Sequence, residues 1–68
     1  MGISIGDVYR YKEQTLVVVK CDNSFCRCIC FEKGRPDGDR VTESYTALYD
    51  NYTFVGNILT MEGFQNAD

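Results

Sequence analysis

Residues 15–32, which read TLVVVKCDNSFCRCICFE, contain two runs typical of β-strands on either side of a short turn. Both runs are short and rich in β-branched, aromatic and other apolar residues, a composition that favours strands over helices. Asp22, Asn23 and Ser24 separate the runs, and their side chains readily hydrogen-bond to nearby backbone in turns. This stretch therefore predicts a β-hairpin.

Three more strands are predicted around the hairpin. Alternation and turn signals place them at residues 8–12, 40–46 and 52–58. Residues 47–51 are predicted to form one 3₁₀ or α-helical turn. We therefore expect an all-β fold, namely a five-stranded, partly open SH3-like barrel with one short 3₁₀ or α turn before the last strand. An OB-like barrel is the alternative.

The chain length of 68 residues suits one domain. We expect residues 1–60 to form the barrel and residues 61–68 to form a tail that is frayed or folded back on it. No apolar run approaches the ~20 residues of a membrane helix, and the N-terminus lacks the regions of a signal peptide. We therefore expect a cytoplasmic protein with reduced cysteines and no membrane association.

The charged and catalytic residue types argue against several functions. The net charge is −3, which disfavours nucleic acid as the main ligand, although all seven cations lie in the first forty residues. The chain has no histidine, and it has no phosphate-binding glycine motif. We therefore predict a protein that is not an enzyme and binds no cofactor.

The cysteines invite a metal-site hypothesis, which their spacing disfavours. They are Cys21, Cys26, Cys28 and Cys30. Residues two apart on a strand are separated by ~6.6 Å, whereas the sulfurs of a tetrahedral zinc site lie roughly 3.8 Å apart. We therefore expect no metal.

A two-residue loop at Asn23 and Ser24 predicts the hairpin register. Cys21 then faces Cys26, while Val19 faces Cys28 and Val17 faces Cys30. These six side chains form an apolar face that suits a barrel interior, because free cysteine packs as a small hydrophobe. We favour core packing, with a metal site or a cross-strand Cys21–Cys26 disulfide or redox role as the alternatives.

The opposite face of the hairpin is the predicted partner-binding surface. On it, apolar residues surround two cations, and the set is Leu16, Val18, Lys20, Arg27, Ile29 and Phe31. An apolar patch with a basic centre is typical of a protein interface. The alternative is that the end of the chain, with Ile58, Leu59, Met61 and Phe64, folds over this face.

A second surface is the predicted alternative for nucleic acid. It combines aromatic and basic residues, namely Tyr9, Arg10, Tyr11, Lys12 and Arg35. The tyrosine rings can instead pack in the core, which we favour because a small core needs its aromatic residues.

The stretch Ile5-Gly6-Asp7-Val8-Tyr9-Arg10-Tyr11-Lys12, followed by Leu16-Val17-Val18-Val19, resembles the start of SH3-like barrels of the KOW and Tudor-like branches. The chain is also similar to small phage and prophage proteins that begin Gly-x-x-Tyr-x-x-Lys and end with a short turn before an aromatic strand, a pattern that Ser44 to Val55 fits. The resemblance implies a protein-binding module that inhibits or modulates a host enzyme or defence complex in the bacterial cytoplasm. A homodimer and a KOW/Tudor-like nucleic-acid binder are the alternatives.

Overall fold

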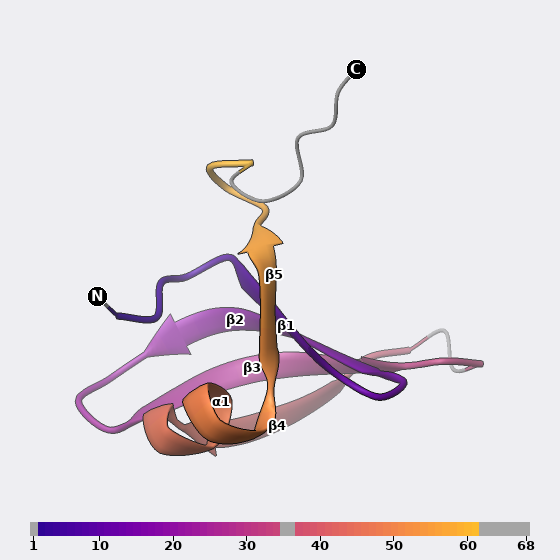
Figure 1. Cartoon of the computed structure of the whole chain (residues 1–68), viewed down its shortest axis with the longest axis horizontal. Helices are drawn as coiled ribbons and strands as arrows, with labels where there is room; N and C mark the ends of the chain where they lie inside the picture. Colours follow the sequence, from indigo (N-terminus) through magenta and orange to yellow (C-terminus); the bar gives the residue numbers. More distant parts are fainter. Residues whose placement is uncertain (1, 35–36, 62–68) are drawn as a thin grey trace.

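The computed structural model of the chain describes residues 2–34 and 37–61. They form one antiparallel five-stranded sheet and one short helix (Figure 1). In chain order the elements are β1 (Asp7–Tyr11), β2 (Gln14–Cys21), β3 (Phe25–Glu32), β4 (Asp39–Ser44), α1 (Tyr45–Asn51) and β5 (Thr53–Asn57). The predicted all-β fold of five strands with one short helical turn before the last strand is confirmed, and the five strands form one open sheet.

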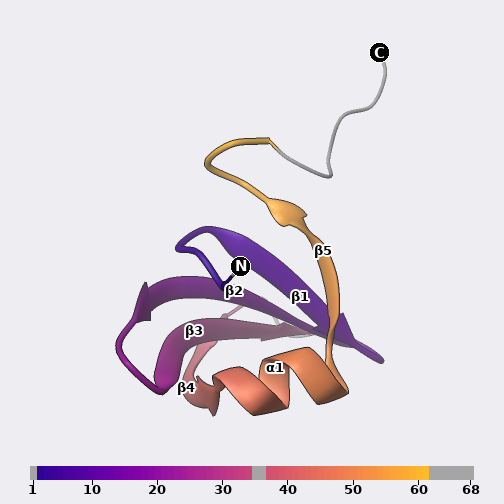
Figure 2. The same ribbon diagram turned by 60° about the vertical axis from the view of Figure 1, so that its left-hand side comes forward.

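The strand order is β4-β3-β2-β1-β5, so the last strand returns to pair with the first. Figure 2 shows the sheet curled, with α1 between its two edge strands, β4 and β5. The core lies on the face of the sheet that α1 covers, called the inner face below. Its buried residues are Tyr9, Leu16, Val18, Cys26, Cys28 and Leu48.

Helix α1 is longer than the predicted turn over residues 47–51. Ser44 is its N-cap, because its Oγ accepts a hydrogen bond from the backbone N–H of Ala47 at 3.1 Å. The helix therefore begins at Tyr45, inside the stretch predicted as the fourth strand. Leu48 is the residue of α1 that is fully buried, and it fixes the helix against the sheet.

The register of the central hairpin follows the prediction only near its turn. Cys21 faces Cys26 and Lys20 faces Arg27, as expected, but a β-bulge then interrupts β2 between Val18 and Lys20. Val18, rather than the predicted Val19, consequently faces Cys28. A single extra residue exchanges the two faces of a strand beyond it.

The bulge makes part of the predicted face assignment wrong. Leu16 and Val18 are 0% and 1% exposed and belong to the core, whereas Val19 is 46% exposed. Val17 faces Ile29 rather than Cys30. The physical reason is that residues 16–19 are all apolar, so their sequence has no alternation to indicate which side chains point inward.

Two buried polar residues fasten the end of β5 to the start of β1. Asn57 Nδ2 donates to Asp7 Oδ1 at 2.7 Å, and Asn57 Oδ1 accepts from the backbone N–H groups of Leu59 and Thr60. Among the described residues, no buried side-chain nitrogen or oxygen lacks a hydrogen-bond partner. This network is therefore a fully satisfied structural joint.

The described chain ends in a turn after β5. Ile58, Leu59 and Met61 are exposed there, so these three side chains are not buried on the sheet. The prediction that Phe64 and the rest of residues 62–68 fold back lies outside the described residues. Within the described ranges, no helix is long and apolar enough to cross a membrane.

Candidate functional site

The candidate site is the face of the sheet opposite the inner face, called the outer face below. Residues paired across antiparallel strands share a face, so three rows of paired residues define it. The rows are Lys20, Arg27 and Thr42; Val8, Val17, Ile29 and Arg40; and Arg10, Thr15 and Phe31.

Charge is segregated between the two faces. The strands contain four cations, Arg10, Lys20, Arg27 and Arg40, and all four lie in rows of the outer face. The strands contain four acidic residues, Asp7, Glu32, Asp39 and Glu43, and all four lie in rows of the inner face. The outer face is therefore basic, even though the whole chain has a net charge of −3.

Three of these cations border one open hollow of about 600 Å³ on the outer face. Lys20, Arg27 and Arg40 line it together with the apolar residues Val19 and Ile29. Val19 reaches the hollow because the bulge turns its side chain away from the core. The hollow thus combines apolar surface with positive charge.

The loop between β3 and β4 borders the outer face next to this hollow. A Cβ atom placed on Gly38 would overlap Ile29 Cγ2 and lie 2.9 Å from Phe31 Cε1. Only glycine fits this close approach without displacing the two side chains. Phe31 nevertheless remains 39% exposed, so the face keeps an accessible aromatic ring.

The chemistry of the outer face is that of binding. Its side chains are Lys, Arg, Thr and apolar groups, and none of these is a general base at neutral pH. Cations in this setting attract carboxylates or phosphates, and the apolar groups between them supply buried area when a partner covers them.

The structure divides the predicted partner-binding set. Lys20, Arg27, Ile29 and Phe31 share the outer face, whereas Leu16 and Val18 lie in the core and cannot contact a partner. Sequence reasoning missed Val17, Val19 and Arg40. The only sequence signal for the two valines was the run of three valines itself, which shows that either set of alternate residues could point inward. Arg40 could be assigned to this face only once the pairing of β4 with β3 was known.

The tyrosines of the predicted nucleic-acid surface lie on the inner side. Tyr9 is 5% exposed and packs edge-on against Phe54, with ring centroids 5.6 Å apart. Burial, with the neighbouring Asp7 carboxylate, raises the pKa of Tyr9 above its ordinary value. Tyr11 packs edge-on against Tyr52 at 5.9 Å. Tyr9 is therefore a core ring, whereas Tyr11 keeps 45% of its surface exposed beside Tyr52.

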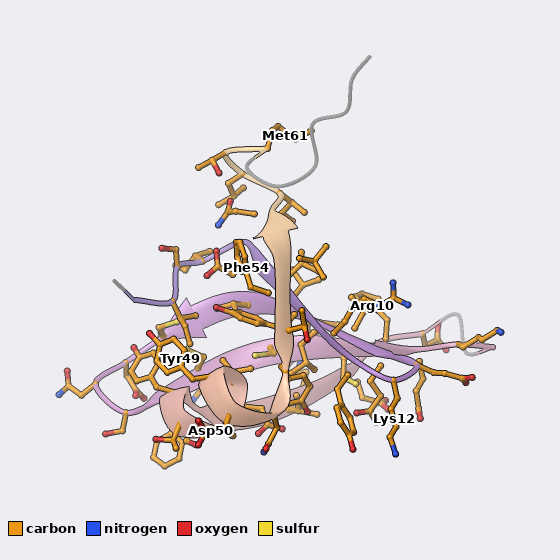
Figure 3. The ribbon with its side chains drawn as sticks, viewed as in Figure 1. Arg10, Lys12, Tyr49, Asp50, Phe54 and Met61 are labelled. Carbon is orange, nitrogen blue, oxygen red and sulfur yellow. The ribbon has the colours of Figure 1, made fainter. Side chains whose placement is uncertain are left out.

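Of the described cations of that predicted surface, Lys12 meets a tyrosine and Arg10 does not. Arg10 belongs to the outer face, and Lys12 lies in the β1–β2 turn with its amine 5.2 Å from the centre of the Tyr11 ring. Both lie away from Tyr49 of α1 (Figure 3). Arg35 is outside the described residues. The predicted set therefore does not share one surface.

All four cysteines are free thiols, and they pack as the preferred interpretation predicted. Cys26 and Cys28 are buried, and burial raises the pKa of Cys26 to about 12 and that of Cys28 to about 11. In the part of the chain that is described, no three Cys, Asp or Glu side chains are grouped so that they could hold a metal ion.

The chain matches no protein-family model, and the comparisons with curated proteins and with solved structures found no match either. Function is therefore inferred from the geometry of the outer face.

Proposed function

We propose that this chain is a non-catalytic module that binds another protein through its outer face. The segregation of charge carries the proposal, because four strand cations share a face with exposed apolar groups while the strand acids lie on the other face. Such a face complements a partner surface whose apolar centre is bordered by Asp and Glu.

A module of this kind acts by occupying a surface of its partner. The side chains of the outer face offer contact and charge but no acid–base chemistry, so binding would block or reposition part of the partner. An inhibitor or modulator of a bacterial enzyme or defence complex, encoded by a phage or prophage, is the form of this function that the sequence resemblance favours.

Nucleic acid is the second candidate, and the same cations favour it. Arg10, Lys20, Arg27 and Arg40 could each approach a phosphate, because no strand acid shares their face. Against it, the tyrosine rings available for stacking lie on the inner side. Valine and isoleucine, which occupy the centre of the outer face, provide no flat surface for a base, so stacking there would depend on the exposed Phe31.

Affinity capture from a bacterial lysate separates the two candidates. The tagged protein and an Arg27→Glu/Arg40→Glu variant are compared, with and without nuclease, over a series of salt concentrations. We expect a stoichiometric protein that the wild type captures in the presence of nuclease and that the variant loses. A doubly substituted control, Asp50→Lys/Asn51→Lys on exposed positions of α1, should capture it as the wild type does.

The result that would overturn the proposal is capture that depends on nucleic acid. Phosphate binding weakens steeply with salt, with a slope of log K against log [salt] of about −0.9 for each phosphate contacted on duplex DNA. Loss of the captured material on nuclease treatment, together with a slope of this kind, would establish the nucleic-acid function instead.

A further inference from the structure

Two cysteines at the tip of the central hairpin are arranged as a reactive pair. Cys21 and Cys26 lie directly opposite each other, and their sulfur atoms are 2.7 Å apart. The backbone N–H of Asp22 donates to the carbonyl of Phe25, which closes the hairpin. Because hydrogen-bonded and non-hydrogen-bonded pairs alternate along an antiparallel ladder, the adjacent Cys21–Cys26 pair is non-hydrogen-bonded.

This position suits a disulfide without movement of the strands. In non-hydrogen-bonded pairs the Cα atoms are ~4.5 Å apart and the side chains are close together. Disulfides span Cα separations of about 4.4–6.8 Å. The backbone around Cys21 and Cys26 therefore already has a spacing that a disulfide accepts.

Local hydrogen bonds hold the hairpin tip in place. Asp22 Oδ1 accepts from the backbone N–H groups of Ser24 and Phe25, at 3.0 and 2.9 Å. From α1, the Tyr45 hydroxyl donates to the carbonyl of Asp22, and the Tyr45 N–H donates to the carbonyl of Ser24. These hydrogen bonds fix the hairpin tip and therefore hold the two sulfur atoms close to each other.

The two thiols differ in accessibility. Cys21 is half-buried and borders a small hollow of about 140 Å³ at the hairpin tip, whose other lining residues are Lys20, Asp22, Phe25 and Arg27. Cys26 is 0% exposed, and burial raises the pKa of its thiol to about 12. A reagent from solution therefore meets Cys21 first, and Cys26 is reached only through Cys21.

We propose that Cys21 and Cys26 form a thiol–disulfide exchange site whose substrate is a small disulfide of the class of oxidised glutathione. Cys21 is the half-buried member of the pair, so a small disulfide can reach its sulfur from solution, whereas the buried Cys26 is closed to it. The site is independent of the function proposed for the outer face.

The exchange has two balanced steps. The thiolate of Cys21 attacks one sulfur of the small disulfide, whose S–S bond breaks, and the first thiolate leaves and takes up the proton that Cys21 released. Cys26 then loses its proton to the solvent and attacks Sγ of Cys21, which expels the second thiolate, and that thiolate is protonated in turn. The protein loses two electrons and two protons, and the small disulfide becomes two thiols.

Incubation of the reduced full-length chain with oxidised glutathione tests the site. Intact mass, a count of free thiols and a peptide map are recorded over time. We expect the wild type to lose two of its four thiols and to acquire a Cys21–Cys26 link. The Cys26→Ser variant should stop at a glutathione adduct on Cys21, and the folded Cys21→Ser variant should not react.

Cys30→Ser is the matched control, because Cys30 is also half-buried and on the inner face, and this variant should form the link as the wild type does. A wild type that keeps all four thiols, a link between other cysteines, or a folded Cys21→Ser variant that reacts at the wild-type rate would overturn the proposal. Circular dichroism establishes which variants are folded. If a variant is not, the wild-type thiol count and peptide map decide by themselves.

Discussion

Replacing Val18 with alanine should lower the free energy of unfolding by about 2–3 kcal/mol, whereas the same change at Val19 should cost less than about 1 kcal/mol. The two residues are neighbours of the same type in the same strand. Val18 is 1% exposed and Val19 is 46% exposed, because consecutive strand residues point to opposite faces and the bulge in β2 leaves Val18 as the inward one. The pair therefore provides its own matched control.

The magnitude at Val18 follows from its burial. Valine to alanine removes two methyl groups, each with a transfer free energy of about 0.8 kcal/mol, so the lost burial amounts to about 1.6 kcal/mol. The cavity left between β2, β3 and α1 adds to this, since surrounding side chains relax only in part. Val19 is 46% exposed, so only about half of this burial, or about 0.8 kcal/mol, is lost there, and no closed cavity is left.

Urea unfolding followed by circular dichroism measures both values. The slope of the free energy against urea should stay the same in both variants, because neither change alters the area exposed on unfolding to a large extent. Val18→Thr and Val19→Thr extend the comparison, since threonine keeps the shape of valine. A hydroxyl at position 18 would be buried without a partner at a cost of about 1–3 kcal/mol, and at position 19 it would face water.

The reverse order of the two costs would refute the face assignment. If Val19→Ala destabilised the protein more than Val18→Ala, β2 would run without a bulge. Leu16 and Val18 would then point outward, and the outer face would be the one predicted from the sequence.

Three further changes test the core, the buried joint and the hairpin turn. Leu48→Ala should cost about 2–5 kcal/mol in urea unfolding, because the fully buried Leu48 is what holds α1 on the sheet. Asn57→Ala should cost about 2 kcal/mol or more in the same assay, because it leaves the buried Asp7 carboxylate without its donor at Oδ1. For Asp22, hydrogen bonds from the N–H groups of Phe25 and Ser24 hold the pKa of the folded state below its ordinary value. The stabilisation of the folded state by the ionised Asp22 side chain is therefore fully present above the pKa that Asp22 has in the unfolded state. It is lost as the pH falls through the lower pKa that Asp22 has in the folded state. Acid titration of stability should consequently show a smaller loss for Asp22→Asn, which keeps an acceptor but does not titrate, than for the wild type.

Exposed positions of α1 supply the controls for these three predictions. Tyr49→Ala and Asn51→Ala should each change the free energy of unfolding by less than about 1 kcal/mol, because both side chains face solvent. Asn51→Ala, at an exposed position that does not titrate, should leave the acid titration of the wild type unchanged in shape. A Leu48→Ala cost no larger than that of Tyr49→Ala would contradict the described core, and an Asn57→Ala cost no larger than that of Asn51→Ala would contradict the buried joint. If Asp22→Asn lost as much stability in acid as the wild type, the described hydrogen bonds of Asp22 would be wrong.

The strands of the fold could be predicted because each run ends at a residue with turn chemistry. Asp22 to Ser24 end one strand, and the glycine-rich loop after Glu32 ends the next. The start of α1 could not be placed in the same way. Ser44 acts as an N-cap because it lies at the end of β4, next to the core. The residues around Ser44 have the composition of a strand, so the sequence did not indicate that a helix begins there.

The candidate site could be predicted only in part, for a reason that lies in β2. Near the turn, the pairing of Lys20 with Arg27 follows from the two-residue loop and is confirmed. Past the turn, any of the residues 16–19 could fill the core, and a bulge decides among them. A bulge has no reliable sequence signal, because its cause is the fit of the whole strand to the curled sheet and to α1.

The segregation of charge likewise needed the structure. Arg40 is separated from Arg27 by a loop, and only the pairing of β4 with β3 brings them to one face. A net charge of −3 gave no indication of a basic surface, since the acidic residues of the strands collect on the opposite side.

The most direct test of the proposed function is the affinity of the captured partner for two glutamate variants, measured by titration calorimetry. Val19→Glu places a negative charge in the middle of the outer face, and Tyr49→Glu places one on the exposed side of α1; both positions are accessible, so both variants should fold. We predict binding at least tenfold weaker for Val19→Glu, which corresponds to about 1.4 kcal/mol, and unchanged binding for Tyr49→Glu. Unchanged binding by Val19→Glu, with a loss for Tyr49→Glu, would contradict the assignment of the outer face as the binding surface.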